Sequence, residues 1–449
     1  MHFLFGEGIL MGSQKSENEL FSDNAAAGGG LLHRRLFLKS GSLLLSSLAA
    51  SSVMARQAIS KETEDWQTEA PKWSKVPGAP LREYGSPSPF ENHVSRAVIK
   101  PYGDMAPGSG IALTPLQHLR GSITPNGLHF ERSHNGVPQI DPDKHRFFIH
   151  GLVKKPLEFT MDQLSRYPMV SKICFIECSG NSFFNSNLFP DAMQVPVGHL
   201  HGLISAAEWT GIRLSTLLDE AGVDLNAKWL VAEGIDAAGM SRSIPMEKAL
   251  DDVIVALYQN GERIRPEQGY PMRLVLPGFE GNMSVKWLHR IKVQNQPSYS
   301  KDETSKYSEL RPNGKADLFT YTMGAKSTIT SPATGLKMQG PGVYEVTGLA
   351  WSGFGKVKRV EVSADGGRSW ADAHLEDPVR DRSLTRFKLL WNWDGKPQTL
   401  LSRAFDEKGN TQMTHAKWSS SYAAGQVYHC NAIQSFKINS DGSINNVQI

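Results

Sequence analysis

A single cysteine stands where an apolar strand runs into a loop of small polar residues. Cys178 lies in residues 175–182 (FIECSGNS), and the end of a strand is a rigid place from which to present a reactive side chain. A thiolate at this place suits a soft metal centre. Two other interpretations stay open from this segment alone: a small buried hydrophobic side chain, or a nucleophile whose base comes from elsewhere in the chain.

A second candidate site is formed by Arg132 and His134 in residues 130–138 (FERSHNGVP). Because they are two residues apart, their side chains would face the same way on an extended segment. A guanidinium offers forked donors to a phosphate or a sulfur oxyanion, and an imidazole donates or accepts according to its tautomer. The pair therefore suits an anion, although taken alone it is also explained as two exposed loop residues.

The cysteine content limits the redox chemistry that the chain can carry by itself. Cys174, Cys178 and Cys430 are too few for a disulfide framework and leave at least one thiol unpaired. The sequence contains no CxxCH haem motif, no CxxC pair and no glycine-rich dinucleotide or Walker loop. If the chain is a redox enzyme, its electrons leave through a group that this sequence does not encode.

Length and composition indicate an ordinary globular chain with two domains. The 449 residues are 40% hydrophobic and 21% charged. A single hydrophobic core stops growing at about 250–300 residues, so two cores are expected. The formal net charge of +3 is spread without a basic run, and no nucleic-acid partner is expected.

The elements around the cysteine are predicted to form a mixed α/β domain over residues 116–325. Short apolar strands at 147–150 and 172–176 alternate with helical stretches at 161–167 and 214–221. The second of these strands leads directly into the cysteine loop.

Residues 326–449 show a different pattern. Alternating strands at 342–348 and 357–362 are separated by turns such as Asp-Gly-Gly at 365–367, which is typical of an immunoglobulin-type β-sandwich. The predicted fold class is therefore α+β, with a mixed α/β domain followed by an immunoglobulin-like β-sandwich.

The N-terminal residues are predicted to direct export. Paired arginines at 34–35 precede an apolar run at 43–50 that is too short for a permanent membrane anchor, and a small-residue cleavage site follows. This order indicates a twin-arginine signal peptide over residues 1–55 and a periplasmic mature protein, with a cytosolic amphipathic N-terminus as the alternative. Residues 56–115, rich in Pro, Gly and Ser, are predicted to form an extended arm.

Six motifs occur in the order in which the sulfite oxidase family has them, so the chain resembles that family from about residue 123 to near its C-terminus. The motifs are RSH at 132–134, ECSGN at 177–181, WTG at 209–211, GID at 234–236, GYPMR at 269–273 and VKWL at 285–288. The resemblance implies a molybdenum cofactor with a single molybdopterin, whose metal is bound by Cys178. It also implies that the sandwich is a dimerisation domain and that the chain forms a homodimer through it.

The resemblance carries over the cofactor contacts residue by residue. It places the pterin and its phosphate against Phe130, Glu131, Arg132, Ser133, His134, Asp236, Arg273, Ser284, Val285 and Lys286. A further cofactor position, usually His in this family, falls on Gln268. Arg273 and Lys286 would neutralise phosphate charge and Asp236 would accept pterin N–H groups, whereas two surface charges bordering a strand are the alternative for the cations.

The substrate side departs from the animal members of the family, which carry further arginines there. The positions after the metal cysteine are Ser182 and Phe183, and the counterpart in the sandwich falls close to Leu389. Two positive charges are therefore missing, unless a nearby arginine such as Arg386 folds into the pocket. Fewer cations predict weaker binding of a small dianion.

The predicted catalytic residues are Cys178, Arg132 and Tyr258. Cys178 would tune the metal, and Arg132 would stabilise negative charge that develops on sulfur-bound oxygens. The active-site tyrosine of the family aligns with Leu257, and Tyr258, one residue along, is the predicted substitute.

Two segments resemble the sulfane dehydrogenase branch of the family: the cysteine loop and the C-terminal run YHCNAIQSF at 428–436. In that branch a molybdenum subunit pairs with a separate c-type dihaem cytochrome and oxidises sulfane sulfur held on a carrier protein. The resemblance thus implies oxygen-atom transfer to carrier-bound sulfur, with electrons passed to the cytochrome. A sulfite dehydrogenase using cytochrome c is the alternative enzyme, and a metal-free adhesion or carrier-binding protein is the alternative from another class.

Overall fold

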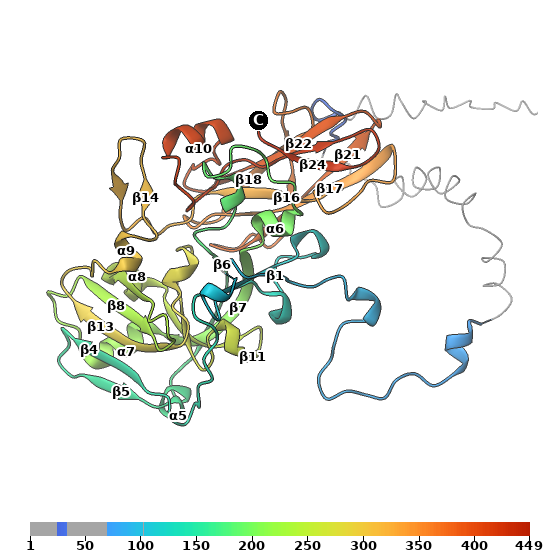
Figure 1. The fold of residues 1–449 in the computed structure, drawn as a ribbon. Helices are drawn as coiled ribbons and strands as arrows, with labels where there is room; N and C mark the ends of the chain where they lie inside the picture. Colours follow the sequence, from blue (N-terminus) through green and yellow to red (C-terminus); the bar gives the residue numbers. More distant parts are fainter. Residues whose placement is uncertain (1–24, 34–69, 102) are drawn as a thin grey trace, which may run out of the picture.

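The computed structural model describes residues 25–33, 70–101 and 103–449 (Figure 1). The arginine pair at 34–35 and the apolar run at 43–50 lie outside the described residues. Within the described part of the chain, no helix is both long and apolar enough to cross a membrane.

Two five-stranded sheets build the first large domain (Figure 1). One has the order β11 (Glu262–Arg263), β10 (Ile254–Gln259), β7 (Ile204–Arg213) and β6 (Val170–Glu177), with β12 (Arg273–Val275) also paired to β10. The other has the order β5 (Leu157–Phe159), β4 (Phe147–Gly151), β13 (Leu288–Gln294), β8 (Trp229–Gly234) and β9 (Ser241–Pro245). The mixed α/β domain predicted from the sequence is confirmed, and sheet dominates it.

Short helices cover this core. In α7 (Leu214–Ala221) the four buried residues are Leu214, Leu217, Leu218 and Ala221, the spacing of one helix face, and the helix ends at Gly222 with a φ of 68°. The other α-helices are α5 (Met161–Ser165), α6 (Val197–His201), α8 (Met246–Asp251), α9 (Lys301–Thr304) and α10 (His415–Ser421). The 3-10 helices are Lys72–Lys75, Pro89–Glu91, Gly103–Met105, Leu116–His118, Asn126–Leu128, Phe183–Asn185, Pro266–Gln268 and Gly281–Met283.

The predicted extended arm has two parts. Residues 70–93 are almost all exposed, as an arm would be. Beyond them, β1 (Ala97–Ile99) and β2 (Gly110–Leu113) form a three-stranded sheet with β3 (Glu131–Ser133). The second part of the arm therefore supports the strand that carries Arg132.

The C-terminal domain is a two-sheet sandwich, as predicted. One sheet has the order β16 (Lys326–Ser331), β17 (Gly342–Trp351), β21 (Thr385–Trp393) and β20 (His374–Leu375). The other has the order β19 (Ala371–Asp372), β18 (Val357–Ser363), β22 (Gln398–Asp406), β23 (Ser435–Ile438) and β24 (Ile444–Val447). Fully buried side chains such as Val360, Phe387, Trp391 and Phe436 form one core between them. A two-stranded hairpin, β14 (Glu309–Leu310) with β15 (Ala316–Asp317), projects from the connection between the domains (Figure 1).

A buried carboxylate joins the two domains at the end of β6. Glu177, with no exposed surface, accepts from Lys326 Nζ at 3.1 Å and from Trp351 Nε1 at 2.6 Å, and both donors belong to the sandwich. Its Oε1 also accepts from Asn181 Nδ2 at 2.9 Å, within the cysteine loop. The sandwich therefore holds the residue that precedes Cys178.

We predict that Lys326→Met lowers the melting temperature by several degrees. The substitution leaves the Glu177 carboxylate buried without its cation, and breaking a buried pair in this way costs about 3–5 kcal/mol. Differential scanning calorimetry of the variant measures the shift. The double variant Lys326→Met/Glu177→Gln should recover part of the loss, because no charge then stays buried alone.

The matched control is Lys396→Met, because the Lys396 side chain is 81% exposed and its ammonium pairs with Asp394 at 3.1 Å. An exposed pair contributes about 0–1 kcal/mol, so little change is expected. A Lys326→Met protein that melts like this control would show that the domain contact contributes nothing to stability.

Candidate active site

One cavity of about 720 Å³ gathers the residues that the sequence predicted to hold a pterin. Its lining includes Phe130, Glu131, Arg132, Ser133, His134, Asp236, Gln268, Arg273, Ser284, Val285 and Lys286. The described cysteines are all free thiols, and of these only Cys178 lines this cavity. Motifs separated by more than a hundred residues therefore meet around one thiol.

The end of β6 places Cys178 at the cavity. Its backbone N–H donates to Leu203 O at 3.0 Å, and its carbonyl accepts from Asn181 N at 2.8 Å, so the loop is fixed on both sides of the thiol. The 3-10 turn that follows β12 approaches closely at Gly281, where a Cβ would lie 2.9 Å from Glu177 O. Glycine at 281 therefore lets two strand ends meet at the site. Burial raises the pKa of the Cys178 thiol.

Two cations face the cavity, and no carboxylate of the described residues is bonded to either of them. Arg273 donates to the carbonyl oxygens of Gln268 and Ser284, each at 2.9 Å, and Lys286 Nζ donates to Glu267 O at 2.9 Å. Burial, followed by the charge of Arg273, lowers the pKa of Lys286 to about 7. Burial also lowers the pKa of Arg273. Such a pair of cations suits an anion, since a phosphate would supply the missing opposite charge.

The remaining donors and acceptors also fit a pterin with a phosphate. His129 Nε2 is buried and has no hydrogen-bond partner among the described residues. The cavity is lined by His129, and burial lowers the pKa of this imidazole to about 3, so it is neutral. Half-buried Asp236 supplies a carboxylate on the same lining. An unpaired ring nitrogen, a carboxylate and two cations together form a mixed set that matches the polar edge of a pterin and its phosphate.

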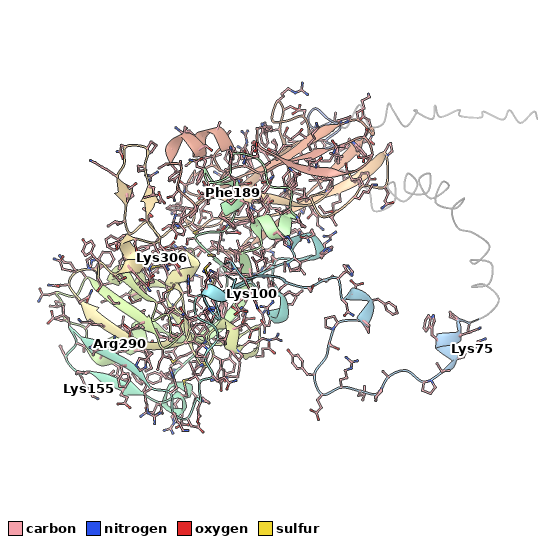
Figure 2. All side chains as sticks on the ribbon, viewed as in Figure 1. Lys75, Lys100, Lys155, Phe189, Arg290 and Lys306 are labelled. Carbon is pink, nitrogen blue, oxygen red and sulfur yellow. The ribbon has the colours of Figure 1, made fainter. Side chains whose placement is uncertain are left out.

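A second hollow, of about 1350 Å³, opens onto the other side of the thiol. It shares Cys178, Arg132 and His134 with the cavity, and Lys301 and Lys306 also line it. Figure 2 shows Lys306 where the first domain faces the sandwich. The thiol thus lies between the cavity lined by the predicted cofactor contacts and a wider hollow.

The sequence predicted that uncharged residues replace two arginines on the substrate side. Ser182 is buried, Phe183 lines the hollow and Leu389 lies in the sandwich core. Arg386 does not line the hollow; it is buried in the sandwich and its Nε donates to Gly121 O at 2.8 Å. Arg386 therefore does not replace a missing arginine.

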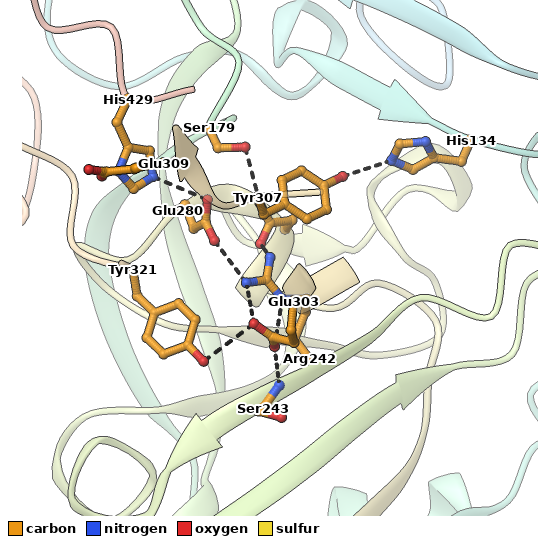
Figure 3. A network of polar contacts seen from close by, with 11 residues as sticks. His134, Ser179, Arg242, Ser243, Glu280, Glu303, Tyr307, Glu309, Tyr321 and His429 are labelled. Carbon is orange, nitrogen blue, oxygen red and sulfur yellow. Dashed lines mark hydrogen bonds and ion pairs between the residues drawn. The ribbon is translucent and has the colours of Figure 1, made fainter. Parts of the chain in front are cut away.

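Tyr258 lies away from the thiol, so the structure corrects its predicted role. It lines neither the cavity nor the hollow, and the Arg263 guanidinium lies 4.9 Å from its ring centre. Leu257 is fully buried in the core. The tyrosine that lines both spaces is Tyr307, whose hydroxyl lies 3.2 Å from His134 Nε2 (Figure 3).

Sequence reasoning missed Tyr307 because no local pattern marks it. It follows α9 with a φ of 56°, a left-handed conformation that only the folded structure reveals. Burial raises the pKa of its phenol far above the usual range, whereas burial lowers the pKa of His134 to about 3. The phenol therefore stays protonated and donates to a neutral imidazole.

A buried ionic network supports Tyr307 from below (Figure 3). Arg242 has no exposed surface; it donates to Glu280 at 2.9 Å and to Glu303 at 3.0 Å, and also bonds Asn282. Its guanidinium carbon lies 4.9 Å from the Tyr307 ring centre, a cation–π contact. The network fixes the ring that faces the thiol.

The C-terminal segment closes the network against the cysteine loop (Figure 3). His429 lies between Glu280 at 3.2 Å and Glu309 at 3.0 Å. Burial alone would lower the pKa of this imidazole, but the two carboxylates raise it to about 9. The backbone N–H of His429 donates to Ser179 O at 2.8 Å, so the segment also holds the residue after Cys178.

Comparison with known proteins agrees with this geometry. A family model described as the oxidoreductase molybdopterin binding domain matches residues 134–301, and one described as the Mo-co oxidoreductase dimerisation domain matches residues 317–436. The crystal structure of the sulfane dehydrogenase SoxCD from Paracoccus pantotrophus is 42% identical, with a TM-score of 0.83 over 86% of this chain and 99% of that one. The chain belongs to the sulfite oxidase family of molybdopterin oxidoreductases. The predicted cofactor, molybdenum with molybdopterin, is thereby confirmed.

Curated relatives show the breadth of the family. The mitochondrial sulfite oxidase of Rattus norvegicus is 30% identical over 65% of this chain and 57% of its own length. An NADH nitrate reductase of Ulva prolifera is 30% identical over 67% of this chain and 39% of its own length. NADH nitrate reductase 2 of Nicotiana tabacum is 33% identical over 70% of this chain and 39% of its own length. The chain thus spans about two fifths of the nitrate reductases that it matches.

We predict that molybdopterin binding to the cofactor-free chain takes up a proton and weakens as the pH rises above about 7. The reason is that Lys286 loses its charge above its lowered pKa, whereas a bound phosphate favours the ammonium. Titration calorimetry in buffers of different ionisation enthalpy measures the proton uptake between pH 7 and 9.

Lys286→Arg is the matched variant, because a guanidinium stays charged throughout this range. It should bind with a flat pH profile, while Lys286→Met should bind weakly at every pH. If wild type and Lys286→Arg have the same pH dependence, the titrating group is not Lys286.

Proposed function

We propose that this chain is the molybdenum subunit of a sulfane dehydrogenase, which oxidises sulfane sulfur held on a carrier protein. The observation that carries the proposal is the wide hollow in front of Cys178, whose lining has one arginine, Arg132, while its two lysines, Lys301 and Lys306, belong to a separate segment around α9. A compact dianion such as sulfite needs convergent cations, but a sulfur atom on a protein arm can be held by surface contacts remote from the metal. The likeness to SoxCD supports the same conclusion.

The residues around the thiol have separate tasks in this proposal. The bound cofactor supplies oxygen-atom transfer and two-electron redox chemistry, and Cys178 provides the protein ligand to its metal. The Nη1 of Arg132 lies 3.4 Å from Gly110 O. In this proposal the guanidinium donates to the oxygens bound to the substrate sulfur, which gain negative charge during the reaction. Tyr307 is kept in place by its hydrogen bond to His134 and by the network beneath it.

Partners follow from the same proposal. The likeness to SoxCD supports a separate c-type dihaem cytochrome as the acceptor of the electrons. A sulfur-carrier protein presents the substrate. The match to a dimerisation domain supports a homodimer formed through the sandwich.

We predict that carrier-bound sulfane has a specificity constant at least tenfold above that of free sulfite. Each lost charge-assisted hydrogen bond weakens binding by about 1.5–3 kcal/mol, and two arginines are absent from the sulfite side. Steady-state assays of the purified holoenzyme with sulfite, carrier-bound sulfane and nitrate, each with and without the dihaem cytochrome, measure this ratio.

Cys178→Ser serves as the inactive control, because a hard oxygen ligand changes the metal's potential while the pterin contacts remain. If free sulfite equals or exceeds the carrier-bound substrate, the enzyme is a sulfite dehydrogenase. Turnover of nitrate alone would replace both assignments with that of a nitrate reductase.

Periplasmic export is proposed from the arginine pair and the short apolar run that follows it. We predict that replacing Arg34 and Arg35 by Lys retains cofactor-loaded precursor in the cytoplasm. Cell fractionation followed by a molybdenum assay of each fraction measures its distribution. Unchanged export of the double variant would show that the pair is not a signal.

A further inference from the structure

A stretch that ends just before the arginine pair is folded, although its sequence, AAAGGGLL at 25–32, looks featureless. Ala25 pairs with Leu32 as an antiparallel bridge, and Ala26 N donates to Leu31 O at 2.8 Å, which closes a tight hairpin. Leu31 has no exposed surface and Leu32 is 2% exposed. The stretch is therefore packed against the protein rather than solvated.

The hairpin pairs with the part of the β21 edge that β20 does not cover. Strand β20 pairs with β21 at residues 387–388, and Glu376 N donates to Arg386 O at 2.8 Å, so β20 does not cover the part of that edge beyond Lys388. The hairpin continues the pairing there: Leu32 N donates to Leu390 O at 3.0 Å and Asn392 N donates to Gly30 O at 2.9 Å. Strand addition of this kind is a common way for proteins to bind an extended peptide.

Side chains of the sandwich hold the hairpin from both sheets. The Trp391 indole donates to Gly29 O at 2.7 Å, and Gly28 N donates to Ser369 Oγ at 2.7 Å. Leu31 joins the core cluster that fills the space between the two sheets. This binding site is complete only when both sheets are packed together.

The glycines are required by the fit. A Cβ on Gly30 would lie 2.1 Å from Asn392 O, and one on Gly29 would lie 2.9 Å from backbone atoms of Ala364. Both glycines also have positive φ values, 88° and 70°, which L side chains rarely adopt. The glycine run is therefore shaped to this surface.

We propose that residues 25–32 are a docking element that binds the folded sandwich domain of the same chain. By binding there, the element holds the residues directly before the arginine pair against the sandwich. Because the site needs both sheets, docking distinguishes a folded precursor from an unfolded one. If the predicted signal peptide is cleaved, the docking element is removed with it, and the β21 edge at residues 390–392 is uncovered. This consequence alone rests on the proposed export.

Hydrogen exchange with mass spectrometry on the full-length chain tests the docking. Segments 25–33 and 389–393 should both be protected in the wild type, and Gly30→Ala should speed exchange in both by at least tenfold. Leu31→Asp should act in the same way, since it places a charge in the core. Pterin content and melting temperature of each variant show that the domains remain folded.

His33→Ala is the matched control, because this exposed residue lies next to the hairpin and outside its contacts. It should exchange like the wild type. The proposal is overturned if segment 25–33 of the wild type exchanges as fast as an unstructured chain, or if Gly30→Ala leaves both segments protected. Since the measurement uses uncleaved chain, its outcome does not depend on whether the export prediction holds.

Discussion

The active site depends on one buried carboxylate, that of Glu177. It lies one residue before Cys178, the proposed metal ligand, and accepts from Asn181 in its own loop and from Lys326 and Trp351 in the sandwich. A buried charge is tolerated only when it is paired and fully hydrogen-bonded, so the position of the loop is tied to the packing of the second domain. The sandwich is therefore part of the catalytic structure as well as the dimerisation domain of the family.

Charge is distributed differently on the two sides of the thiol. On the cofactor side, Arg273 and Lys286 are bonded to neutral oxygens, and burial lowers the pKa of both groups. Below the hollow, by contrast, Arg242 and His429 are paired with carboxylates within the chain. The unpaired cations on the cofactor side favour binding of an anionic cofactor. The ion pairs beneath the hollow form a rigid support that is stable without a ligand.

The sequence predicted what lies in short contiguous motifs. Every predicted pterin contact lines the cavity, because each motif ends a strand or turn whose local geometry is set by its own residues. Tyr258 was misplaced because neighbouring residues on a strand face opposite sides, so a one-residue shift directs the side chain elsewhere. Tyr307 depends on a left-handed residue, and His429 reaches Glu280 across 149 positions, which no local pattern reveals.

The hairpin at 25–32 is another feature that short sequence patterns do not reveal. A composition of alanine and glycine is typical of a flexible linker. The residues that explain these glycines, Ala364 and Asn392, lie more than 330 positions away in the sequence. An open strand edge is a hazard for pairing with other chains, and this hairpin covers the part of β21 that β20 leaves free. The hairpin that protects this edge thus lies within the predicted signal peptide, so substitutions at Gly30 or Leu31 alter the folded sandwich and the predicted signal together.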